Sequence, residues 1–265
     1  MIIDFHTHIF PDKIAEATIQ HLKSKANVVA YTNGTIGNLK ASMQNAGIDY
    51  SVTLPIATVP KQTGSINLFA SQITGKDGII SFGSIHPLYE DWKNELDRIK
   101  ALGLVGIKLH PDYQQFFVDD EAILPMLQYA TQLGLIIIFH GGVDIGIPGY
   151  IHCTPQRVKN LLKSLKGARL VIAHLGGYLC WDEVEKYLIG EDIYFDTSYV
   201  LGKISDEQFL RIIRNHGVEK ILFATDSPWG NQEQAVKKIM SLPFTEYEKS
   251  AIMHKNAEGL LGLTL

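Results

Sequence analysis

Cysteine is scarce in this sequence, with two residues, Cys153 and Cys180, in a chain of 265. Two cysteines are too few for a disulfide scaffold or a four-cysteine zinc site, so ordinary thiols in a reducing compartment are expected. The chain also lacks any apolar run long enough to span a bilayer, and its first residues lack the basic and apolar regions of a signal peptide. We therefore expect a soluble cytoplasmic protein with no membrane partner.

Concentrated positive charge is absent as well. The chain has 24 Lys and Arg against 28 Asp and Glu, a formal net charge of -4, and it contains no basic block that could contact several phosphates. Nucleic acid is therefore not expected as a partner. The glycine patterns of phosphate-binding loops and the GxSxG nucleophile motif are missing too, which argues against nucleotide binding and serine-based catalysis.

The chain does have a regular alternation of apolar runs and helical patterns. Because the runs are almost continuously apolar, they predict strands that are covered on both faces, as in a parallel sheet wrapped by helices. Eight such strand–helix units followed by a last helix predict an α/β protein with a single (β/α)8 TIM barrel, one domain over residues 1–265. The eight runs occupy residues 2–8, 50–56, 79–85, 104–110, 135–140, 169–174, 192–198 and 220–226, and their ends are 24 to 48 residues apart.

Histidines and one aspartate gather where these runs end. Active sites of TIM barrels lie at the carboxyl ends of the strands, so the side chains are expected to face the barrel mouth. Imidazoles and a carboxylate from several strands suit one divalent ion, with zinc expected first and manganese or iron as alternatives, and an open position would make the site catalytic. These residues are His6 and His8 in the first run, His110 in the fourth, His140 in the fifth, His174 in the sixth and Asp226 in the eighth.

An ordered set of motifs resembles a known family. The segments DFHTHIFP, GIKLHP, FHGG, AHLGG, ATDSPWG and NAEGLLGL are similar to those of the amidohydrolase superfamily, in the branch that includes aminocarboxymuconate semialdehyde decarboxylase-like enzymes. The resemblance runs from residue 2 to the carboxyl end. It implies that His6, His8, His140 and Asp226 bind the metal and that His174 is a catalytic histidine. The resemblance is also compatible with a homodimer.

Lys108 and His110 are predicted to contact the substrate. They are two residues apart, so both can face the same side of the fourth strand. In dinuclear relatives a carbamylated lysine at this strand bridges two metals, and His174 would then bind the second ion. We expect a single metal, with Lys108 holding an anionic substrate or pairing with a carboxylate.

Two reactions are compatible with this constellation. A metal-activated water could cleave a C–N or C–O bond of a small amide, lactone or ester, with Asp226 moving the proton and His174 stabilising the oxyanion. We take this hydrolase as the main prediction, because the loops of the fourth and fifth strands carry no arginine to hold a carboxylate. Non-oxidative decarboxylation of a small unsaturated or aromatic acid is the alternative, and a non-catalytic scaffold is a third possibility. Asp4, His86 and Asp196 are expected to be structural, and Tyr150, His152 and Trp229 are weaker candidates for substrate contacts.

Overall fold

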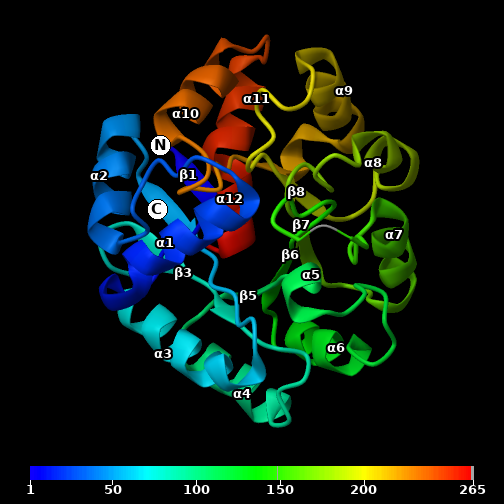
Figure 1. The fold of residues 1–265 in the computed structure, drawn as a ribbon. Helices are drawn as coiled ribbons and strands as arrows, with labels where there is room; N and C mark the ends of the chain where they lie inside the picture. Colours follow the sequence, from blue (N-terminus) through cyan, green and yellow to red (C-terminus); the bar gives the residue numbers. More distant parts are fainter. Residues whose placement is uncertain (148, 264–265) are drawn as a thin grey trace. The chain divides into compact units, whose positions relative to one another are not determined.

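The computed structural model describes residues 1–147 and 149–263 (Figure 1). Contacts within the chain divide it into two compact units. Unit 1 comprises Met1–Thr53, Gly75–Ile80 and Asp196–Leu265, and unit 2 comprises Leu54–Thr74 and Ser81–Phe195. The predicted single domain over residues 1–265 remains a prediction, and its last two residues lie outside the described part of the chain.

Unit 1 is built around β1 (Ile3–Thr7), which is buried along its whole length. On one side β1 pairs in parallel with β2 (Tyr50–Thr53), and β3 (Ile79–Ser81) follows β2 in the sheet. On the other side, the amide of Phe5 donates to the carbonyl of Phe223, just after β9 (Ile221–Leu222). The carboxyl end of β1 therefore lies beside the segment that leads into Asp226.

Unit 2 contains a run of parallel strands in chain order. β4 (Gly83–Ser84), β5 (Gly106–Leu109), β6 (Ile136–Phe139), β7 (Arg169–Ile172) and β8 (Tyr194–Asp196) pair successively. Every residue of β5 and β6 is buried. Burial on both faces is what the continuous apolar runs predict, because no face of these strands is left to the solvent.

Helices connect the strands, and side-chain caps start several of them. In unit 1 these elements are α1 (Asp12–Ala26), α2 (Ile36–Ala46), α9 (Asp206–His216), η2 (Val218–Lys220), α10 (Gln232–Ser241), α11 (Glu246–Ser250), the π-helical η3 (Ala251–Lys255) and α12 (Asn256–Leu261). In unit 2 they are η1 (Pro60–Gln62), α3 (Thr63–Ile73), α4 (Trp92–Ala101), α5 (Pro111–Gln114), α6 (Leu124–Gln132), α7 (Pro155–Ser164) and α8 (Trp181–Tyr187). Within unit 1, α2 packs against α10, and Figure 1 shows the two side by side. None of the helices in the described residues has both the length and the apolar character needed to cross a bilayer.

Each predicted apolar run contains a strand, but several strands end before the carboxyl end of the predicted run. The run at 220–226 is a strand only over Ile221–Leu222, and the run at 169–174 stops at Ile172. His174 and Asp226 have φ angles of 62° and 65°, in the left-handed region that a strand cannot contain, so neither run can remain a strand to its predicted end. The run at 79–85 is also interrupted, at Phe82, between β3 and β4. Most of the predicted site residues therefore lie just after a strand rather than at its last residue.

Candidate metal centre

Three predicted ligands meet in unit 1. His6 lies within β1, His8 follows it, and Asp226 comes from the loop after β9. The distances are 3.1 Å between the two Nε2 atoms, 3.3 Å from His6 Nε2 to Asp226 Oδ1, and 3.1 Å from His8 Nε2 to the same oxygen. Two histidines and one carboxylate thus present one atom each to a common point.

Backbone hydrogen bonds hold this arrangement. The amide of Asp226 donates to the carbonyl of His6 at 2.8 Å, and the amide of His8 donates to the carbonyl of Ser227 at 2.6 Å. The two segments therefore remain in register after β9 has ended. The left-handed backbone of Asp226 is uncommon for a residue with a side chain, and such conformations concentrate at functional sites.

The triangle has the dimensions of a metal-binding face. Nitrogen and oxygen ligands lie about 2.0–2.2 Å from an ion such as zinc, so two ligands of one ion are about 3.0–3.4 Å apart in octahedral or tetrahedral geometry. The three separations in unit 1 fall in this range. The donor set of two imidazoles and a carboxylate suits zinc and manganese. The residues present therefore fit a divalent ion.

His6 is held from behind by two residues of the chain segment that follows Phe195. Its Nδ1 atom lies 2.8 Å from Asp196 Oδ2 and 3.0 Å from Ser198 Oγ. The sequence prediction that Asp196 is merely structural missed this contact. The sequence did contain a signal for this pair. Side chains alternate along a strand, so Asp196 and Ser198, two residues apart at the end of a strand, face the same side.

Asp4 is structural, as predicted. It is fully buried and accepts hydrogen bonds from the Thr225 hydroxyl at 2.6 Å and from Gln232 Nε2 at 2.7 Å. Burial raises the pKa of Asp4 to about 7, although these hydrogen bonds act in the opposite direction. Asp4 also accepts the amide of Thr225 at 3.0 Å, so it ties β1 to the residue that precedes Asp226.

The other predicted site residues lie in unit 2. Lys108 is almost fully buried in β5, and His110, His140 and His174 directly follow or come shortly after their strands. The rings of His110 and His140 are stacked with centroids 4.1 Å apart, and His140 Nδ1 lies 3.0 Å from His174 Nε2. The three predicted imidazoles of unit 2 are therefore brought together.

His140 has the properties of a neutral ligand. Burial, together with the neighbouring rings of His110 and His174, lowers its pKa well below the usual value. Its Nε2 atom is buried and has no hydrogen-bond partner among the described residues. A neutral imidazole with an unused ring nitrogen is the form that binds a metal ion.

Asp144 is a neighbour of His110 that the sequence did not single out. Its Oδ2 atom lies 3.0 Å from His110 Nε2, and together with His140 these atoms are close enough to surround an ion. However, His110 Nδ1 accepts the amide hydrogen of Tyr113 at 3.3 Å, so the ring proton of neutral His110 lies on Nε2. We therefore interpret the contact as a hydrogen bond from His110 to Asp144. Asp144 is in a loop with no distinguishing spacing, so the sequence carried no signal for it.

Glycine beside His140 allows two loops to approach closely. A Cβ on Gly142 would lie 2.3 Å from the amide nitrogen of Tyr178, and the φ of Gly142 is 79°. Gly142 also forms a parallel bridge with Tyr178, so the loops that follow His140 and His174 lie against each other.

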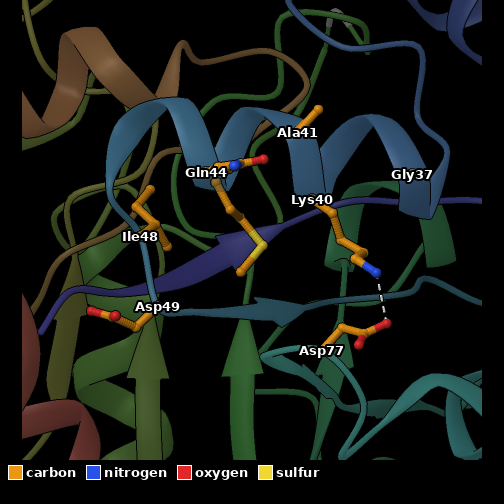
Figure 2. Close-up of a pocket in the computed structure, with 8 residues that line it drawn as sticks. Gly37, Lys40, Ala41, Gln44, Ile48, Asp49 and Asp77 are labelled. Atoms are coloured by element: carbon orange, nitrogen blue, oxygen red, sulfur yellow. Dashed lines mark hydrogen bonds and ion pairs between the residues drawn. The ribbon is translucent and has the colours of Figure 1, made fainter.

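One pocket of about 530 Å³ lies away from these ligands, beside α2 (Figure 2). Lys40 and Asp77 form a 2.7 Å ion pair at its edge. Asp49 and Asp77 precede β2 and β3, so the pocket is at the amino ends of the strands, whereas His8 and Asp226 are at the carboxyl end of β1. Both partners of the pair are well exposed, and such pairs contribute little stability. We assign no role to this pocket.

Comparison with known proteins decides the family. A sequence model for the family described as Amidohydrolase matches residues 3–263. The chain belongs to this amidohydrolase family. The family resemblance seen in the sequence motifs is therefore confirmed, and so is the prediction of an enzyme. No curated protein sequence matches the chain.

Solved structures of similar fold cover nearly the whole amidohydrolase chain. An uncharacterized TIM-barrel protein from Bordetella bronchiseptica has a TM-score of 0.79 at 17% identity, covering 98% of both chains. A 5-carboxyvanillate decarboxylase from Sphingomonas paucimobilis has a TM-score of 0.70 at 15% identity, covering 100% of this chain and 99% of its own. A dihydroxybenzoic acid decarboxylase from Polaromonas sp. JS666 was solved with bound manganese and an inhibitor. It has a TM-score of 0.73 at 16% identity, covering 100% of this chain and 97% of its own. The predicted α/β class and TIM-barrel fold are confirmed.

Proposed function

We propose that this amidohydrolase-family protein is a metal-dependent, non-oxidative decarboxylase of a small aromatic or unsaturated acid. The observation that carries the proposal is the convergence of His6 Nε2, His8 Nε2 and Asp226 Oδ1 in a member of this family. The choice of reaction is supported by the neighbours of similar fold, several of which are decarboxylases of aromatic acids. They favour the alternative sequence prediction over the hydrolase.

The ligands in this proposal are His6, His8 and Asp226, with His140 as the fourth ligand that the family resemblance implies. Manganese is the first ion to test, since two decarboxylase neighbours contain it. Zinc, which the sequence prediction placed first, remains an alternative, because the donor set accepts both metals. Lys108 and His110 remain the predicted substrate contacts.

When bound, the ion supplies a fixed positive charge that orients an acidic substrate. Breaking the bond to the carboxylate leaves an electron pair on carbon, which must receive a proton as carbon dioxide leaves. Asp226 is the proposed carrier of that proton, through a carboxylate that backbone hydrogen bonds hold beside His6. His174 is proposed to hold the reacting group, with its ring oriented by His140 Nδ1.

Hydrolysis remains the second candidate, because the family description names amidohydrolases. The proposal is tested by assaying manganese-loaded or zinc-loaded protein with two panels of substrates. One contains hydroxybenzoates, including 2,6-dihydroxybenzoate and 5-carboxyvanillate, and the other contains amides, esters and lactones. Carbon dioxide release from an acid, abolished in Asp226→Asn, supports the decarboxylase. Turnover only in the second panel contradicts it and supports the hydrolase.

Metal content tests the site without a substrate. We expect about one ion per chain, lost in His6→Ala and retained in Lys108→Met, which keeps the volume of this buried side chain. Two ions that decrease together when Lys108 is replaced would instead support the dinuclear, lysine-bridged site. No ion in the wild type after loading would contradict the catalytic proposal and leave the scaffold alternative.

Three finer assignments belong to this proposal. Cys153 and Cys180 form no disulfide within the described residues, which agrees with a cytoplasmic location but does not test it. A homodimer and a single domain over residues 1–265 are also proposed. Sedimentation of the purified protein and a single cooperative unfolding transition would support these two assignments respectively.

A further inference from the structure

We propose that Asp196 is a positioning residue that presets the tautomer and orientation of His6 for a divalent ion, with Ser198 as its support. This inference rests on the proposed function, because it concerns the same metal ligands. It assigns a role to a segment, FDTS at residues 195–198, that no motif of the family resemblance includes.

The hydrogen bonds around His6 Nδ1 determine which ring nitrogen carries the proton. Ser198 Oγ donates its hydrogen to Asp196 Oδ1, and a hydroxyl has only one hydrogen to give. Both atoms that face His6 Nδ1, Asp196 Oδ2 at 2.8 Å and Ser198 Oγ at 3.0 Å, are therefore acceptors. Neutral His6 must therefore carry its proton on Nδ1, and its Nε2 atom is then left with a lone pair.

The other ring nitrogen of His6 faces the other two proposed ligands. His6 Nε2, on the opposite side of the ring, is the atom that lies 3.1 Å from His8 Nε2 and 3.3 Å from Asp226 Oδ1. The tautomer that Asp196 selects is thus the one that presents a lone pair to the other two ligands. Hydrogen bonds from a carboxylate to a ligating histidine fix its ring and increase its basicity.

Hydrogen bonds from Ser198 fix the orientation of the Asp196 carboxylate. Its Oδ1 atom accepts both the Ser198 hydroxyl and the Ser198 amide, the latter at 3.0 Å. Asp196 and His6 are each at most 1% exposed, so water does not compete with their contact. The carboxylate therefore has a defined orientation before any ion arrives.

Thr197 lies between Asp196 and Ser198, and its side chain points to the opposite side of the chain. Its hydrogen bonds hold residues 196–198 in place. Its hydroxyl accepts the amide of Ala224 at 2.9 Å and donates to the carbonyl of the same residue at 3.0 Å. The Thr197 amide donates to the carbonyl oxygen of Leu222 at 3.0 Å. Residues 196–198 are consequently held against the strand and loop that carry Asp226, so the support of His6 and the third ligand form one assembly.

The experiment measures metal affinity and histidine tautomers. Manganese and zinc affinities are determined by competition with a chelator for the wild type, Asp196→Asn and Ser198→Ala. The matched control is Asp112→Asn, because Asp112 Oδ1 forms an equally short, partly buried contact of 2.8 Å with His152 Nδ1 that involves none of the proposed ligands. Long-range proton–nitrogen NMR spectra of the metal-free wild type report the His6 tautomer, with the His6 signals identified by their loss in His6→Gln.

We expect Asp196→Asn to weaken metal binding by about 10- to 100-fold, the usual effect of removing a carboxylate behind a ligating histidine. Ser198→Ala should weaken it less, and Asp112→Asn should leave it unchanged. The metal-free wild type should carry the His6 proton on Nδ1, whereas Asp196→Asn should give a mixture of tautomers.

Unchanged affinity in Asp196→Asn, with one ion bound by the wild type, overturns this inference and leaves the proposed function intact. A wild-type His6 protonated on Nε2 also overturns it, and this measurement stands even if Asp196→Asn does not fold. A wild type that binds neither ion overturns both the inference and the proposed function.

Discussion

Gly230 lies so close to the carbonyl oxygen of Thr225 that a Cβ atom on Gly230 would be 1.9 Å from it. Thr225 directly precedes Asp226, and the amide of Gly230 donates to the Asp226 carbonyl at 3.2 Å. The turn that places Asp226, the proposed carboxylate ligand, therefore depends on the missing side chain of Gly230.

Gly230→Ala should disturb the metal centre, since the added methyl group meets backbone that cannot yield as a flexible side chain can. We expect a loss of about 1–3 kcal/mol in the free energy of unfolding, typical of overpacking, and weaker metal binding. Gly259→Ala in α12 is the matched control, because nothing lies within 4 Å of its added Cβ. That control should be neutral or stabilising by up to about 1 kcal/mol. Wild-type metal affinity in Gly230→Ala would refute the prediction.

Asp226→Asn and His174→Gln should separate metal binding from catalysis. Both should reduce kcat by about 10²- to 10⁴-fold, as expected when a proton carrier or a group at the reacting atoms is removed. Asp226→Asn should also reduce the metal content, whereas His174→Gln should retain one ion per chain. Loss of metal in His174→Gln would show that His174 is a ligand and would favour the dinuclear site.

Asp144→Asn should affect substrate binding more than turnover. The substitution removes the negative charge that accepts the hydrogen bond of His110 at 3.0 Å, and His110 is a predicted substrate contact. We expect an increase in KM of about tenfold, the difference between a hydrogen bond to a charged group and one to the neutral amide that replaces it, with little change in kcat. Asp119→Asn, which breaks the ion pair with Arg157, is the control and should leave KM unchanged. Equal effects of the two variants would argue against a role for His110 in binding.

The start of α11 should make a pH-dependent contribution to stability. Glu248 accepts the amide of Thr245 at 2.7 Å, and this hydrogen bond lowers the pKa of Glu248 below its usual 4.5. Because the pKa is lower in the folded state, the stabilisation is complete above pH 4.5 and is lost as the pH falls through the folded-state pKa. Thr245→Ala should cost about 1 kcal/mol at neutral pH, since it removes the N-cap.

Urea unfolding at several pH values tests this prediction. Glu248→Gln should flatten the acid limb of the stability curve, because its amide can still accept the hydrogen bond but does not titrate. Glu246→Gln, in the same helical turn, should leave that limb unchanged, since Glu246 is largely exposed. An unaltered acid limb in Glu248→Gln would contradict the assignment.

The strands and most helices could be predicted because their signals are local. A continuously apolar run such as 135–140 identifies β6 wherever it lies in the fold. The carboxyl ends of the strands were predicted less well, because the left-handed backbones of His174 and Asp226 depend on segments distant in sequence. The amide of Asp226, for example, is held by the carbonyl of His6.

The candidate ligands could be predicted because each lies within or shortly after a predicted strand, but their supports could not. Asp196 acquires its role by lying against His6, which is 190 residues away in sequence. Asp144 likewise owes its role to the neighbouring ring of His110. The spacing of Asp196 and Ser198 places both on one side of the chain, but the sequence does not show that this side faces His6, and the spacing of Asp144 carries no signal.

The converging ligands of unit 1 also bear on how long the protein survives in a cell. The two imidazoles and the carboxylate come within 3.3 Å of one another only in the folded chain, so a cation that needs all three binds the folded state alone. A ligand that binds only the folded chain raises its stability by about 4 kcal/mol at a thousandfold excess over Kd. We therefore expect chains made during metal starvation to unfold more often and to be degraded first, so that the abundance of the enzyme follows the metal supply.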